Sequence, residues 1–421
     1  MEVLLHYAWK HKIFPLKELK STLGKTIEII DPGLHNKNSG PDFFNAKIKI
    51  DGILWIGNVE IHQNTSDWYK HEHHKNPAYD SIILHVAENA DCELFRSNGE
   101  SIPQIQLQCP DNVINHYNEL TKNDDYPPCY KIIPSLSSFF IHNWMNALQI
   151  ERMEEKSKLI LQRWEKYEKD WERTFFVTLA RNYGFGINGE IFERWSSHVS
   201  LSATAKYRND LFKIEAIFFG QAGLLNEEIC DTYYQKLQKE YQYLSYAFDL
   251  KKMESHLWRF MRLRPTNFPY IRIAQLAWIY YEKQGLFSKL MECCTLFDIY
   301  NCLNTQTSEY WETHYMFGKE SPKCTKHMSK NSQDLIIINT IIPLLFTYGK
   351  HSCNEELCQR ALTLMDRLKA EKNFITRMWK QCGLEIKNAG DSQALIQLKK
   401  EYCDKKKCLH CRIGFEYLKR K

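Results

Sequence analysis

The pattern of hydrophobic and polar positions predicts a β-hairpin near the start of the chain. Between Phe43 and Ile50, apolar residues alternate with two lysines, which is the period of a half-buried strand. Asp51 and Gly52 follow, and this pair favours a type I′ turn because both of its central positions take φ > 0. We therefore expect a return strand over residues 53–62.

Three polar residues of this hairpin are predicted to form a site. Residues two apart in a strand share a face, so Glu60 and His62 point away from the apolar Val59 and Ile61. Antiparallel pairing brings Asp42, at the head of the first strand, close to both of them. Two adjacent carboxylates raise one another's pKa unless a cation lies between them. The pattern therefore predicts a divalent metal.

The same residues resemble a known motif. Pro41-Asp42, one hairpin and then Glu60-Ile61-His62 are similar to the PD-(D/E)xK arrangement of the restriction-endonuclease-like phosphodiesterases. The resemblance implies Mg²⁺ or Mn²⁺ on Asp42 and Glu60 and hydrolysis of phosphodiesters in DNA or RNA. The lysine of the family falls at His62, where a neutral imidazole can still act as a general base.

The order of the remaining elements fits the same fold. The patterns predict a helix over 2–14, strands over 26–30 and 81–86, a polar segment over 66–79 and a second hairpin around Asn98-Gly99 with 102–107 as its return arm. This order is the one expected of a restriction-endonuclease-like core, an α/β mixed sheet flanked by helices, over residues 1–130. His85 lies in an apolar strand and is interpreted as a core histidine.

Further candidate metal ligands surround the hairpin. An acid on the first helix often joins the site in that fold, and Glu2 has a matching position, although a first-turn acid also favours the helix dipole. His71 and His73 follow the hairpin and could bind zinc or another transition metal. In a regular helix these two histidines do not share a face. A different metal hydrolase, built on Glu60, His62, His71 and His73, predicts that they nevertheless converge on His62.

Residues 122–134 are rich in proline and aspartate, and we predict a domain boundary there. From 135 to 400 the patterns predict long helices, hence a mostly α-helical domain. Within it, Arg262, Arg264 and Arg272 flank two prolines. One interpretation is that these arginines bind phosphate. The alternative is that they stabilise the turn by donating hydrogen bonds to helix-end carbonyls.

The segment 401–421 is a basic tail rich in cysteine. Its Cys403, Cys408 and Cys411 have the spacing C-x4-C-x2-C, and such close thiols favour zinc first and an iron–sulfur cluster second. A fourth ligand would be His410 or the distant Cys382. The alternative is that these are ordinary reduced cysteines of a cytosolic protein.

Composition narrows the function classes. The chain has 421 residues, of which 43% are hydrophobic and 25% charged, as in an ordinary globular protein. A net charge of +5 permits a nucleic-acid partner without identifying one. The longest apolar run, 335–346, is too short to span a bilayer, so we expect no membrane partner and a cytoplasmic location. A non-catalytic nucleic-acid-binding or scaffold protein with a nuclease-like fold remains an alternative, and it predicts weak metal affinity at Asp42 and Glu60.

Nearly the whole chain also resembles a bacterial family defined by a domain of unknown function. The segments that carry the resemblance are 40–43, 57–62, 66–68, 83–86, 264–269 and 408–414. This resemblance implies no particular activity.

Overall fold

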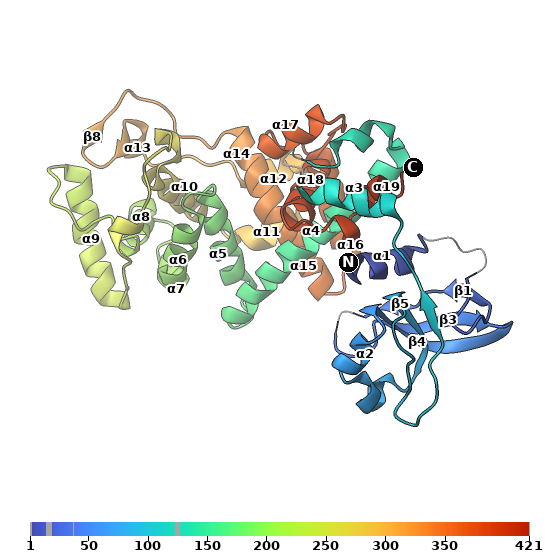
Figure 1. The fold of residues 1–421 in the computed structure, drawn as a ribbon. Helices are drawn as coiled ribbons and strands as arrows, with labels where there is room; N and C mark the ends of the chain where they lie inside the picture. The colour runs from blue at the N-terminus through green and yellow to red at the C-terminus, as the bar shows by residue number, and fades with distance from the viewer. Residues whose placement is uncertain (1, 14–18, 37, 123–126, 421) are drawn as a thin grey trace. The chain divides into compact units, whose positions relative to one another are not determined.

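The computed structural model describes residues 2–13, 19–36, 38–122 and 127–420 (Figure 1). The chain divides into two compact units. The sheet unit contains Met1–Ser137, Cys382–Leu384 and Lys399–Lys421. The helical unit contains Ser138–Gln381 and Glu385–Leu398. An α/β part followed by a mostly helical part is thus confirmed, and the basic tail belongs to the sheet unit.

A mixed sheet forms the centre of the sheet unit. Its strands are β1 (Ile27–Asp31), β2 (Leu34–His35), β3 (Phe43–Ile50), β4 (Ile53–Asn64), β5 (Ile82–Asn89) and β6 (Gln104–Gln106). The strand order is β1-β3-β4-β5-β6, and β2 pairs with β3. β3 runs antiparallel to β1 and β4, whereas β4, β5 and β6 run parallel to one another.

The predicted hairpin is present as β3 and β4. Ile50 pairs with Ile53 across the turn, and Asp51 and Gly52 have φ values of +48° and +81°. These are the conformations that a type I′ turn requires. Gly57 in β4 is required by packing, because a Cβ there would lie 2.3 Å from Cγ2 of Ile83 on β5.

The second predicted hairpin is only partly right. Phe95 and Ser101 form an antiparallel bridge around the turn at Asn98-Gly99. The segment that follows does not continue as a return arm, because β6 instead pairs in parallel with β5. Parallel pairing lets β6 extend the sheet, and Ile105 there is fully buried.

Short helical elements precede and follow the strands of the hairpin. α1 (Glu2–His11) buries Leu4, Leu5, Ala8 and Trp9, and the Trp9 indole donates to the Pro32 carbonyl at 3.0 Å. The predicted end of this helix at residue 14 lies outside the described residues. After β4 come α2 (Asp67–Lys70) and two 3₁₀ turns, His73–Lys75 and Pro77–Tyr79.

The C-terminal tail packs within the sheet unit. Its helix α19 (Arg412–Leu418) contacts α3 (Asp111–Lys122) and the 3₁₀ segment Tyr130–Ser135. Glu119 of α3 accepts hydrogen bonds of 2.7 Å from both the Tyr417 hydroxyl and the Arg420 guanidinium. The end of the chain is thereby attached to a helix near its beginning.

The helical unit is coloured from green to red in Figure 1. Its α-helices are α4 (Ser138–Lys166), α5 (Trp171–Tyr183), α6 (Gly189–His198), α7 (Leu201–Lys206), α8 (Leu211–Gln221), α9 (Thr232–Phe248), α10 (Pro269–Glu282), α11 (Leu286–Glu292), α12 (Leu296–Cys302), α13 (Glu309–Glu312), α14 (Lys330–Ile336), α15 (Ile342–His351), α16 (Glu355–Arg367), α17 (Phe374–Gln381) and α18 (Ala389–Gln397). A two-stranded ribbon, β7 (His314–Met316) and β8 (Lys319–Glu320), follows α13. In the described part of the chain, no helix is both long and apolar enough to cross a membrane.

One of the arginines considered for phosphate binding has a structural role. Arg272 is 4% exposed, and its guanidinium donates to the side chains of Gln275 and Asn267 and lies over the Phe185 ring. It therefore fixes the start of α10, but through side-chain amide oxygens and not through the helix-end carbonyls that the alternative interpretation names. Arg262 and Arg264 are exposed.

Candidate metal centre in the sheet unit

Asp42 and Glu60 interact directly, as the hairpin pattern predicts. The Asp42 backbone N–H donates to Glu60 Oε2 at 3.0 Å, and the Ile61 N–H donates to Asp42 Oδ2 at 3.0 Å. Each carboxylate therefore accepts a hydrogen bond from the strand that carries the other. These bonds leave Oε1 of Glu60 facing the histidines described below.

A β-bulge in β3 lies beside these two acids. Phe43 pairs with Val59 and Ala46 with Gly57, so β3 has one more residue than β4 between these pairs. Asn45 takes φ +55° within the bulge, and its N–H donates to the Asn58 side chain at 3.2 Å. A bulge re-aims the side chains around it. Simple alternation along β3 therefore does not determine where Asp42 points.

Three histidines converge on one point next to Glu60. His62, His71 and His73 each offer one ring nitrogen, and these three atoms lie within 4.8 Å of one another. His71 Nδ1 is 3.3 Å from His62 Nε2. Glu60 Oε1 is 3.6 Å from His62 Nε2 and 3.4 Å from His73 Nε2.

These separations suit a single metal ion. Nitrogen and oxygen ligands bind zinc at about 2.0–2.1 Å, so two ligands of a tetrahedral site lie about 3.4 Å apart. The three separations above range from 3.3 to 3.6 Å. The donor set therefore fits a borderline metal such as zinc.

The convergence of His71 and His73 depends on a break in the helix. α2 ends at Lys70, and Glu72 takes the left-handed conformation with φ +57°. A 3₁₀ turn then begins at His73. On a regular helix His71 would share a face with His74, but the His74 ring instead packs against Tyr69 at 5.1 Å. The polar segment is therefore partly helical and partly irregular, and its irregular part at Glu72 separates His73 from α2.

Burial keeps the imidazoles uncharged. Burial, followed by the nearby His73 and His71, lowers the pKa of His62 to about 4. Burial and the neighbouring His71 lower the pKa of His73 to about 4 as well. Both rings thus present free lone pairs near neutral pH, which is the form that binds a metal.

Within the described part of the chain, the basic groups next to the Glu60 carboxyl are His62 and His73, which burial keeps uncharged. Glu60 is 4% exposed, and burial, followed by the charge of Asp42, raises its pKa to about 9. A cation between Glu60 and the histidines would reverse this shift by favouring the ionised carboxylate. The electrostatics of the described residues therefore match those of a metal centre.

His85 forms a second layer behind the cluster. It is fully buried in β5, directly opposite Glu60 in the pairing register, and its Nε2 lies 2.9 Å from His62 Nδ1. If His62 Nδ1 carries the hydrogen and donates to His85, then His62 Nε2 keeps a lone pair for the metal. The interpretation of His85 as a core histidine is right about burial, but it misses this contact.

Aromatic rings fix the position of His73. Its imidazole stacks on Tyr79 at 3.9 Å between centroids, and the edge of Trp68 lies 5.4 Å away. Trp68 is 1% exposed, so this wall is part of the core. Sequence patterns offered no signal for Tyr79 beyond its place in the polar segment.

His6 of α1 completes the site on the side of Asp42. Its Nε2 lies 3.4 Å from Asp42 Oδ2. Burial lowers the pKa of His6, but the hydrogen bond and charge of Asp42 outweigh burial, so the net shift is upward. Glu2 lies one turn earlier and contributes a smaller upward shift to the pKa of both His6 and Glu60. Glu2 is not one of the three described residues whose ligand atoms converge, and its role as a ligand stays a prediction. Its i, i+4 spacing to His6 is the signal in the sequence that could have identified His6.

Comparison with known proteins identifies a family. Residues 2–374 match the model of a family described as protein of unknown function (DUF2851). The chain belongs to this family. The matched range includes Glu60 and the three histidines of the cluster. Comparisons with curated proteins and with solved structures gave no significant match.

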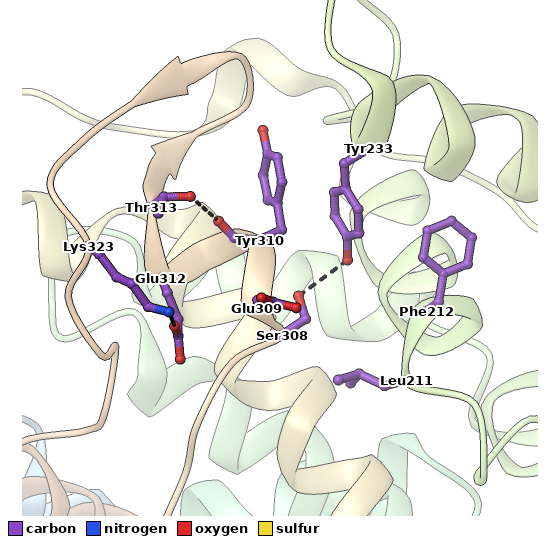
Figure 2. A pocket seen from close by; sticks show the side chains of 9 residues that line it. All are labelled: Leu211, Phe212, Tyr233, Ser308, Glu309, Tyr310, Glu312, Thr313 and Lys323. Carbon is purple, nitrogen blue, oxygen red and sulfur yellow. Dashed lines mark hydrogen bonds and ion pairs between the residues drawn. The ribbon is translucent and has the colours of Figure 1, made fainter.

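A second polar site lies in the helical unit. A cavity of about 550 Å³ lies between α8, α9 and α13. Figure 2 draws the side chains that line it, among them Tyr233, Ser308 and Tyr310. Behind it, the fully buried Glu215 accepts hydrogen bonds from Tyr233 and Ser308. The lining residues drawn in Figure 2 include no histidine or cysteine. Since the polar groups around Glu215 satisfy one another, this cavity is not the better candidate.

Proposed function

We propose that this protein is a metal-dependent hydrolase whose metal ion is held by His62, His71 and His73. The observation that carries this proposal is the convergence of three ring nitrogens within 4.8 Å, with Glu60 Oε1 3.4–3.6 Å from two of them. Three histidine ligands leave a coordination position for water or substrate, as in catalytic zinc sites. The exposed side chain of His71 leaves the site accessible from solvent.

The choice of metal follows from the donor atoms. Imidazole nitrogens suit zinc or iron, whereas Mg²⁺ and Mn²⁺ prefer oxygen ligands. We therefore favour Zn²⁺ over the Mg²⁺ or Mn²⁺ that the resemblance to the nuclease motif implies. When bound, such an ion would supply Lewis acidity toward the substrate.

The residues of the chain have separate roles in this proposal. His62 is a ligand and not the counterpart of the catalytic lysine, because its Nε2 faces the cluster and its Nδ1 contacts His85. Glu60 Oε1 lies at the edge of the cluster, where it can accept a proton or bind the ion. Asp42 and His6 form a partly exposed pair that can transfer a proton to and from solvent.

We propose phosphodiesters of DNA or RNA as the substrate class. The resemblance of Asp42, Glu60 and His62 to the nuclease motif supports this choice. The order α1, β1, β3, β4, α2, β5, which is the order expected of a restriction-endonuclease-like core, supports it as well. A net charge of +5 is compatible with a polyanionic substrate.

The experiment that tests the proposal combines metal binding with cleavage. Purified protein is titrated with Zn²⁺ and Mn²⁺ and assayed on single- and double-stranded DNA and RNA, beside His73→Ala and His74→Ala. His74 is the matched control because it is adjacent in sequence but lies outside the cluster. We expect His73→Ala to lose both metal binding and cleavage, and His74→Ala to keep both.

Two outcomes would contradict the proposal. If His73→Ala and His74→Ala bind metal with equal affinity, His73 is not a ligand and the proposed histidine centre is wrong. Metal-loaded wild type that cleaves none of the substrates would instead favour the non-catalytic nucleic-acid-binding or scaffold alternative.

A further inference from the structure

Four cysteines from distant parts of the chain line one cavity in the sheet unit. They are Cys129, Cys403, Cys408 and Cys411. The last three form the C-x4-C-x2-C pattern of the tail, whereas Cys129 directly precedes the 3₁₀ segment Tyr130–Ser135. The other lining residues are Leu120, Pro128, Tyr402 and Gly414. A fourth thiol is thus available that the spacing in the tail does not reveal.

Local backbone structure places Cys408 and Cys411 on one tight turn. The Cys411 N–H donates to the Cys408 carbonyl at 3.2 Å, which closes a tight turn between these two residues. Gly414 packs onto the same turn, and a Cβ there would lie 2.1 Å from the Cys408 oxygen. A C-x2-C pair on a tight turn is a common half of a zinc site. Any larger residue at position 414 would force the turn open.

Two contacts attach this turn to the part of the chain that carries Cys129. The Lys406 ammonium donates to the Thr121 carbonyl at the end of α3 at 2.9 Å. α19, which starts directly after Cys411, packs against the segment that follows Cys129. The meeting of the four cysteines is therefore built into the packing of the tail.

The electrostatics of Cys129 involve the same three tail thiols that line the cavity with it. Burial raises the pKa of Cys129 well above its usual range, and the next contributions come from Cys403, Cys411 and Cys408. Each ionised thiol would therefore oppose ionisation of the next. A bound cation removes this conflict, because metal ligation stabilises thiolates.

We infer that Cys129, Cys403, Cys408 and Cys411 form a four-thiolate site for a soft metal centre, either one zinc ion or an iron–sulfur cluster. Four cysteine thiolates are a complete ligand set for both centres. The two residues first considered as the fourth ligand are not needed. His410 and Cys382 do not line the cavity, and for Cys382 burial alone raises the pKa.

The role that follows is structural. The four ligands join the C-terminal tail to the segment after α3, so the metal would hold together two ends of the sheet unit. It shares no residue with the histidine cluster. The inference therefore stands whether or not the protein is a hydrolase.

The test measures the metal content of full-length protein purified without oxygen. To separate the two centres, zinc, iron and acid-labile sulfide are measured in the His73→Ala background, with Cys129→Ser or Cys382→Ser added. The background protein is expected to contain one zinc per chain, or iron with an equal amount of sulfide and visible absorption. Cys129→Ser is expected to lose most of this metal, and the control Cys382→Ser is expected to keep it.

A second measurement covers the case in which Cys129→Ser fails to fold. Native background protein is alkylated before and after metal removal, and the modified cysteines are located by mass spectrometry. We expect the four cysteines to become reactive together only after the metal is removed. Protein without zinc or iron, a disulfide among the four cysteines, or full metal content in folded Cys129→Ser would overturn the inference.

Discussion

His85 Nε2 lies 2.9 Å from Nδ1 of His62, and this contact orients the His62 imidazole. His62 is the one member of the histidine cluster that lies on a strand of the sheet. The pair lies on the parallel strands β4 and β5, and His85 is completely buried. The core of the sheet therefore orients His62, whereas His71 and His73 lie on the segment that follows β4.

Replacing His85 is expected to weaken metal binding although His85 does not belong to the cluster. Loss of a second-shell partner typically costs 10- to 100-fold in metal affinity. We expect His85→Phe to lower affinity for Zn²⁺ by about this factor, and His85→Gln, which keeps a hydrogen-bonding group, to lower it less. Competition with a chromophoric chelator measures the change, and an unaltered affinity in folded His85→Phe would exclude the orienting role.

The His62→Lys variant separates the two roles considered for His62. If His62 replaces the lysine of the nuclease motif, this change restores the motif and preserves activity. If His62 is a metal ligand, lysine is protonated at neutral pH and cannot bind the ion. We expect metal binding to be lost, as measured by titration calorimetry, while circular dichroism checks the fold. Retained binding with increased cleavage would favour the lysine role.

The buried Glu215 leads us to expect that the free energy of unfolding depends on pH. Burial raises its pKa from 4.5 to about 7, so the folded state favours the protonated carboxyl. Its contribution is fully present below pH 4.5 and is lost as the pH rises toward 7. Glu215→Gln cannot ionise, so the unfolding free energy of the wild type should fall relative to the variant by up to roughly 3 kcal/mol over this range.

Urea unfolding at pH 5 and pH 8 tests this expectation. Glu309→Gln is the matched control, since Glu309 lines the same cavity but is exposed. Glu309→Gln should follow the wild type at both pH values. A wild type and Glu215→Gln that keep a constant difference between the two pH values would show that Glu215 ionises normally.

Two glycines of the hairpin should respond differently to alanine. At Gly57 the new Cβ would meet Ile83 at 2.3 Å and the Ser81 carbonyl at 2.9 Å, so overpacking is expected to cost about 1–3 kcal/mol. Gly52 has open space around it, so a new Cβ there meets no other atom. Its φ of +81° is strained for alanine, and we expect the substitution to lower the free energy of unfolding by about 1–2 kcal/mol. Thermal unfolding measures both. Since Gly57 lies on β4, the strand that carries the proposed ligand His62, only Gly57→Ala is expected to lower metal affinity too.

Local patterns in the sequence determined the hairpin and its acidic residues. Alternation along the strands and the Asp51-Gly52 turn involve only neighbours in the chain, so the antiparallel pairing of β3 with β4 follows from short-range rules. The direction of the Asp42 side chain also depends on the bulge at Asn45, which these rules do not predict. The element order up to β5 is predictable for the same reason.

Tertiary structure alone decided which side chains form the two candidate metal centres. His71 and His73 converge because Glu72 leaves the helical conformation. The hydrophobic periodicity of the sequence does not predict such a break. Cys129 meets the tail cysteines because α19 packs beside α3, a contact between opposite ends of the chain. A spacing rule reports neighbours along the chain, whereas a ligand set is defined by distance in space, and only the packed fold brings these residues together.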